Sequence, residues 1–213
     1  MERNEMWQVI DAERASAADL LADLSDVEWT YPSLCDGWTV RDVAAHLTLA
    51  PHGSVGRILV AVIKARGNFN RMVHDTAVEQ AALPTTQLVQ LLRDAVGKHR
   101  LAPGQKLKDA MMDVLVHGQD IALPLGLQRP MPLEPAVVSA DHLWHMGFPF
   151  HARKRLAGLR LVATDAEWSA GEGDEVRGPI DALLMLLAGR TATVPRLTGA
   201  GVATLTAKWG LAA

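Results

Sequence analysis

The sequence is poor in cysteine, with Cys35 as the only thiol among 213 residues. A single thiol cannot form an internal disulfide, so a small secreted fold held by disulfides is excluded. The first residues, MERNEMWQVIDAERA, are charged and lack the apolar core of a secretory signal. No run approaches the ~20 apolar residues that a membrane-spanning helix needs. We therefore expect a cytoplasmic protein with no membrane partner.

An excess of positive charge is also missing. The chain has 21 Lys and Arg against 24 Asp and Glu, a formal net charge of −3 and an isoelectric point of about 6.2. Proteins that bind nucleic acids normally carry a basic surface, so we expect no nucleic-acid partner. Hydrophobic residues make up 49 % and charged residues 21 %, which is typical of a globular protein with a sizeable core.

Apolar residues at helical spacing dominate the first two thirds of the chain. Glu13 interrupts the apolar stripe of the first predicted helix. Thr39 and Asp42 have the spacing of a capping pair at the start of the second predicted helix. Pro51 should break or kink that helix at its end. Several helices with short connections fit an antiparallel bundle. The predicted helices span residues 5–24, 39–50, 54–66, 84–99, 107–123 and 134–146.

The pattern changes in the last third, near residues 150–158. Residues 159–164 alternate as a half-buried strand does, and AEWSAG and DEVRG are typical of two more short strands. Pro179 begins a further helix that Gly189 ends. We predict a mainly α protein with a small α+β C-terminal part. It comprises a four-helix bundle over residues 1–150 and a small α/β domain over residues 155–213.

Asp113 and His117 are unusual because they lie in an almost wholly apolar predicted helix. Their four-residue spacing places both side chains on one face, one turn apart. A buried carboxylate is costly unless it is paired or metal-bound, so this pair needs a partner. We select His46, which also lies among apolar residues. Two imidazoles and one carboxylate form an open site that suits zinc, and the same ligands suit iron(II), nickel or manganese.

Other interpretations stay open from the spacing alone. Asp113 and His117 can form a hydrogen-bonded pair in the core, with His46 satisfied separately. A set of two histidines and one carboxylate also occurs in iron(II) oxygenases, although these enzymes usually have other folds. His142 and His145, three residues apart, are best explained as exposed polar side chains.

Three stretches resemble the mycothiol-dependent maleylpyruvate isomerase family, part of the wider DinB-like helical-bundle superfamily. LCDGWTVRDVAAHLT (34–48) and DVLVHGQDIALPLG (113–126) resemble its two helical signatures. EVRGPIDALLMLLAGR (175–190), followed by LTGAGVATL (197–205), resembles its C-terminal domain. The resemblance implies a DinB-like bundle in which His46, Asp113 and His117 hold a metal. The isomerase has Glu at the acidic position. The shorter Asp113 reaches one methylene less far, which favours a shifted or weaker metal site.

Four further residues lie in the matched signatures. Asp120 is either an acceptor for an imidazole N–H near the metal or a solvated helix residue. Trp38 fits packing at the helix start better than substrate contact, and Arg41 fits an exposed position better than a contact to a substrate carboxylate. Cys35 is expected to be a small packing residue because nothing nearby marks its thiol as activated. No residue is assigned a catalytic role.

The resemblance also implies a function. A low-molecular-weight thiol such as mycothiol would be the co-substrate, and the metal would act as a Lewis acid on the thiol or on a substrate carbonyl. We therefore expect a metal- and thiol-dependent isomerase or S-transferase acting on a small electrophile. The alternative is a non-catalytic metal- or ligand-binding protein with a stress or regulatory role. The sequence does not identify the substrate, the thiol or the native metal, and a homodimer is compatible with it.

Overall fold

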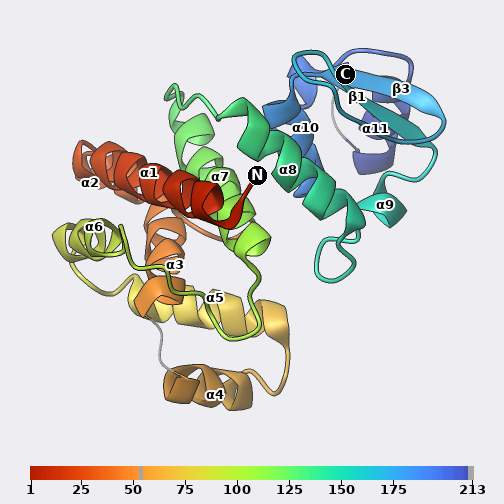
Figure 1. The fold of residues 1–213 in the computed structure, drawn as a ribbon. Coiled ribbons are helices and arrows are strands. Elements are labelled where there is room, and N and C mark those ends of the chain that lie inside the picture. Colours follow the sequence, from red (N-terminus) through yellow and green to blue (C-terminus); the bar gives the residue numbers. More distant parts are fainter. Residues whose placement is uncertain (53–54, 211–213) are drawn as a thin grey trace. The chain divides into compact units, whose positions relative to one another are not determined.

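A computed structural model describes residues 1–52 and 55–210 of the chain (Figure 1). These residues form many helices and one small sheet, which confirms the prediction of a mainly α protein with a small α+β C-terminal part. By contacts the chain divides into two compact units, Glu2–Arg129 and a second unit of Met1 and the residues from Pro130 onwards. This division falls before the pattern change near residues 150–158, and the domain bounds 1–150 and 155–213 stay a prediction.

The first unit is built of helices. α1 packs against α6 and α7, and α3 packs against α5, α6 and α7, so their apolar faces share one core. Buried side chains of this core include Leu21, Val43, Leu47, Leu88, Leu92 and Ile121. The helices are α1 (Arg3–Ala22), α2 (Asp26–Trp29), α3 (Val40–His52), α4 (Val55–Lys64), α5 (Phe69–Gln80), α6 (Thr85–Asp94) and α7 (Leu107–Ala122), followed by the 3-10 turn η1 (Leu123–Leu125).

The start of α3 has the predicted cap. The backbone N–H of Thr39 donates to the Asp42 carboxylate at 2.8 Å, and the N–H of Asp42 donates to the Thr39 hydroxyl at 3.3 Å. Pro51 does not end the helix where we predicted. It lies inside the last turn, and α3 ends one residue later at His52. A proline removes one N–H donor, which a helix tolerates most easily in a terminal turn.

Glu13 interrupts the apolar stripe of α1 because it has a partner far along the chain, and both residues are partly buried. Arg129 donates to the Glu13 carboxylate, to the Glu13 carbonyl oxygen and to the Ser16 hydroxyl. Burial raises the pKa of Glu13, and the charge of Arg129 opposes this effect. Gly118 leaves the necessary space, because a Cβ at this position would lie 2.4 Å from Arg129 Nε.

The second unit combines helices with a three-stranded sheet of order β2-β1-β3. β1 pairs antiparallel with β2 and parallel with β3. Leu159, Leu161 and Ala163 of β1 are buried, as the alternating pattern predicted. α10 is buried along nearly its whole length and packs against α8 and β1. The elements are α8 (Leu133–His145), α9 (Ala152–Arg155), β1 (Leu159–Ala163), β2 (Ser169–Gly171), β3 (Asp174–Gly178), α10 (Ile180–Leu187), η2 (Val194–Arg196) and α11 (Gly201–Trp209).

None of the helices in the described part of the chain has both the length and the apolar character that crossing a bilayer requires.

We predict that Arg129→Met destabilises the protein by about 3 kcal/mol, because it leaves the Glu13 carboxylate buried without its partner. Urea unfolding followed by circular dichroism measures this change. Arg93→Met is the matched control, since Arg93 forms an exposed ion pair with Asp19 and its loss should cost less than about 1 kcal/mol. Equal losses of stability in the two variants would contradict a buried role for Arg129.

Candidate metal site

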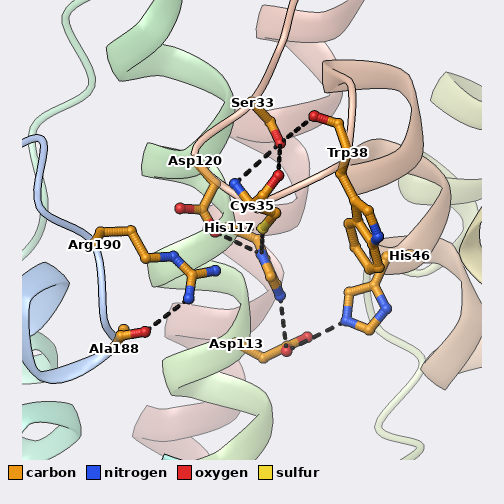
Figure 2. Close-up of polar contacts among 9 residues, drawn as sticks. All are labelled: Ser33, Cys35, Trp38, His46, Asp113, His117, Asp120, Ala188 and Arg190. Carbon is orange, nitrogen blue, oxygen red and sulfur yellow. Dashed lines mark hydrogen bonds and ion pairs between the residues drawn. The ribbon is translucent and has the colours of Figure 1, made fainter. Parts of the chain in front are cut away.

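Two packed helices carry the three predicted ligands. His46 lies in the middle of α3, and Asp113 and His117 lie one turn apart in α7. α3 and α7 pack against each other, and Figure 2 shows the three side chains pointing toward one another between these helices. The structure therefore brings His46 to Asp113 and His117, which lie 67 and 71 positions further along the sequence.

The distances fit a bound divalent ion. His46 Nε2 lies 3.5 Å and His117 Nε2 lies 3.4 Å from the same oxygen, Oδ1 of Asp113. One ligand atom from each residue lies within 4.8 Å of the other two. Two ligand atoms that are each ~2.1 Å from a tetrahedral zinc ion lie about 3.4 Å apart. The donor set and the two distances to Asp113 are therefore compatible with one divalent ion held by these three residues.

Burial and neighbouring charges have opposite effects on the pKa values of Asp113 and His117. Burial alone would raise the pKa of Asp113, but the charges of His117 and His46 outweigh it and hold this pKa well below its ordinary value. Burial alone would lower the pKa of His117, but Asp113, Asp120 and Cys35 outweigh it and raise this pKa. The carboxylates and the imidazoles at this site therefore favour each other's charged forms. Imidazole ligates a metal in its neutral form, so metal binding here would release any proton that the ligands carry.

Asp120 holds the second nitrogen of His117. Its carboxylate oxygen Oδ2 accepts from His117 Nδ1 at 2.8 Å, and the residue is fully buried. With Nδ1 directed at Asp120, Nε2 faces Asp113. A carboxylate behind a ligating imidazole fixes the tautomer and the orientation of the ring, and it makes the ring a better ligand. Nδ1 of His46, by contrast, is buried and has no hydrogen-bond partner among the described residues.

The loop between α2 and α3 closes over Asp120. The Cys35 thiol donates to Asp120 Oδ2 at 3.1 Å, and the backbone N–H of Leu34 donates to the Asp120 carbonyl oxygen at 3.1 Å. Ser33 accepts from the N–H of Cys35 and donates to the carbonyl oxygen of Trp38, as Figure 2 shows. The expectation that Cys35 is only a packing residue is therefore incomplete, because its thiol also contacts the group that orients His117.

Trp38 packs beside the imidazoles. Its ring centroid lies 5.4 Å from that of His46 and 6.4 Å from that of His117, and the side chain is almost fully buried. His74 of α5 lies 6.4 Å from the same indole and was not singled out in the sequence. Arg41 is half-buried and donates to the carbonyl oxygen of Leu83 at 2.7 Å, so its observed partner is the backbone before α6.

Arg14 of α1 is a second residue that sequence reasoning missed. It is buried, donates to the carbonyl oxygen of Ala95 at 3.0 Å and lies 3.6 Å from the Asp11 carboxylate. Burial lowers the pKa of Arg14, and the negative charges of Asp11 and Asp113 oppose this effect. Arg14 thus adds a positive charge that acts on the candidate site. The only sequence signal was a charged residue beside the apolar stripe of α1.

We predict that Asp120→Asn weakens metal binding by 10–100-fold (order of magnitude), because an amide is a poorer acceptor for His117 Nδ1 than a carboxylate. Competition with a chromophoric chelator measures the dissociation constant. Asp94→Asn is the matched control, since Asp94 accepts from Gln90 on the exposed side of α6 and should bind metal as the unchanged protein does. An unchanged metal affinity in Asp120→Asn would show that Asp120 does not support the ligand.

Comparisons with known proteins concern the fold and the N-terminal part of the chain. Residues 10–110 match the family described as "Mycothiol maleylpyruvate isomerase N-terminal domain". No curated protein sequence matches the chain. Among solved structures, the mycothiol-dependent maleylpyruvate isomerase has a TM-score of 0.62 at 15 % identity, over 94 % of this chain and 93 % of that one. A histidine-to-alanine mutant of the isomerase has a TM-score of 0.61 at the same identity and coverage. Residues 10–110 thus match the mycothiol maleylpyruvate isomerase N-terminal domain, and the chain has the fold of that isomerase.

Proposed function

We propose that the chain binds one divalent metal through His46, Asp113 and His117 and acts as a thiol-dependent isomerase or S-transferase on a small electrophile. The observation that carries the proposal is the approach of two Nε2 atoms to one carboxylate oxygen, at 3.4 and 3.5 Å. Zinc is our first choice of metal, and nickel, iron or manganese suit the same ligands.

The thiol part of the proposal rests on the family. The N-terminal match and the shared fold both lead to an isomerase that is named for its dependence on mycothiol. A metal bound by three protein ligands supplies Lewis-acid chemistry, since it lowers the pKa of a thiol or polarises a carbonyl group. We therefore propose mycothiol, or a thiol of the same class, as co-substrate.

The protein's own residues prepare this chemistry. Asp120 holds His117 so that Nε2 stays directed at the shared site, and the Cys35 thiol and Leu34 N–H keep Asp120 in place. Trp38 covers the imidazoles with an apolar ring, which excludes water from one side of the site. A dry, rigid site strengthens electrostatic interactions and requires little reorganisation during the reaction.

The two proposed reactions share their first step. The thiolate sulfur forms a bond to one carbon of a double bond that is conjugated with a carbonyl group. The π electrons of the carbon–carbon double bond move toward the carbonyl oxygen. In an isomerase, the remaining single bond rotates, the carbon–sulfur bond breaks, and the thiolate is released unchanged. In an S-transferase, the adduct takes up a proton and leaves as the product. The alternative of a non-catalytic metal-binding protein requires the metal site without either reaction.

Removal of His46 tests the metal site. We predict that His46→Ala loses more than nine tenths of the metal that co-purifies with the unchanged protein, because two protein ligands rarely hold a divalent ion tightly. Elemental analysis by plasma mass spectrometry measures the metal per chain. His145→Ala is the matched control, since His145 is exposed on α8 and contacts only Asp141 among the described residues. Equal metal content in His46→Ala and the unchanged protein would refute the proposed ligand set.

Catalysis requires a separate test. We predict that the metal-loaded protein accelerates the reaction of mycothiol with a panel of conjugated carbonyl compounds, maleylpyruvate among them, and that His117→Ala shows only the rate of the free thiol. The readout is the loss of conjugated absorbance, with product identity from chromatography. Metal-loaded protein that binds its ion but gives no rate above free thiol would favour the non-catalytic alternative for this panel.

A further inference from the structure

α4 exposes large aliphatic side chains at the outer edge of the first unit. Val60 is 51 % exposed and Ile63 is 68 % exposed. They lie three residues apart in a helix, so they share one face, and Lys64 follows on the same face. Val62, on the neighbouring side, is 39 % exposed. α4 packs on α5, and Figure 1 shows it beyond α5 at the edge of its unit.

The same stretch is basic within an acidic protein. Between Asp42 and Asp75 the sequence contains no acidic residue and four basic ones, Arg57, Lys64, Arg66 and Arg71, although the whole chain has a net charge of −3. Lys64 and Arg66 are exposed and form no ion pair with any residue that the structure describes. Arg71 is compensated, since it lies 3.4 Å from the Asp75 carboxylate. The uncompensated charge thus lies next to Val60 and Ile63.

We propose that the α4 tip, residues 60–66, binds at the surface of a membrane that contains anionic lipids. A short helix with exposed aliphatic residues and adjacent Lys or Arg can insert its apolar side chains among lipid headgroups while its cations contact lipid phosphates. No helix in the described part of the chain is long and apolar enough to cross a bilayer. The proposal is therefore binding at the membrane surface, and it departs from our expectation of no membrane partner.

A second copy of the chain is the less favoured occupant of the α4 tip. In a symmetric dimer the same surface of both copies is buried, so the interface would bring together the Lys64 and Arg66 cations of both copies without a carboxylate from this stretch. Like charges brought together at an interface oppose association. An anionic lipid surface removes this repulsion and also accepts the aliphatic side chains.

The test is co-sedimentation of the full-length, metal-loaded protein with vesicles. We use vesicles of phosphatidylcholine alone and of phosphatidylcholine mixed with phosphatidylglycerol. We expect binding to the mixed vesicles only, and weaker binding at high salt because salt screens the charges. The double variant K64E/R66E should have a vesicle partition coefficient at least about 25-fold lower than that of the unchanged protein. This value follows from about fivefold for each of the two cations removed.

The apolar contribution is tested by V60D/I63D, with Val27→Asp as the matched control. Val27 is 74 % exposed on α2, outside the α4 tip, and its variant should bind as the unchanged protein does. V60D/I63D should bind at least tenfold more weakly, with an unchanged circular dichroism spectrum. Equal binding to both kinds of vesicle, or unchanged binding by V60D/I63D, would overturn the proposal. A dimer in analytical ultracentrifugation that V60D/I63D dissociates would assign the α4 tip to a second copy instead.

Discussion

The central constraint on this molecule is the convergence of two imidazoles on one carboxylate oxygen between α3 and α7. Asp113 is partly buried in an apolar helix, where an unpaired carboxylate is costly, and its contacts with His46 and His117 compensate for that cost. These contacts exist only because the packed faces of α3 and α7 hold the side chains in register. The packing of helices in the core of the first unit therefore also determines where the candidate ligands lie.

Support for this geometry comes from outside the two helices. The loop that precedes α3 bends back onto Asp120, and Asp120 in turn orients His117. Buried charges elsewhere in the first unit follow the same rule. Glu13 is paired with Arg129, and Arg14 donates to backbone carbonyl groups at the end of α6. Polar groups on apolar helix faces here have partners that are distant in sequence, which fixes how the helices pack as well as what they bind.

Many of the helices and strands could be predicted from the spacing of apolar residues. The features that could not be predicted have physical reasons. The ranges of α1, α6 and α7 and the strand at 159–163 follow from apolar spacing that is strong in these segments. α5 was not predicted, because FNRMVHDTAVEQ has a weak apolar pattern and is held by its packing on α3. The link from Cys35 to Asp120 could not be predicted either, since it depends on a loop that returns to α7 85 residues later. The local apolar pattern indicates which face of a helix is buried. It does not indicate which distant residue that face contacts.

Our proposal of thiol chemistry at this site rests on the fold and on the N-terminal domain match, and the short Asp113 side chain is compatible with the ligand spacing that a divalent ion needs. Anomalous diffraction at the absorption edge of the bound metal, from crystals of the full-length protein, tests this account most directly. The account predicts a single strong peak within ~2.2 Å of His46 Nε2, His117 Nε2 and an Asp113 oxygen. A metal-loaded crystal with no peak between these three side chains, or with its peak at other residues, would contradict it.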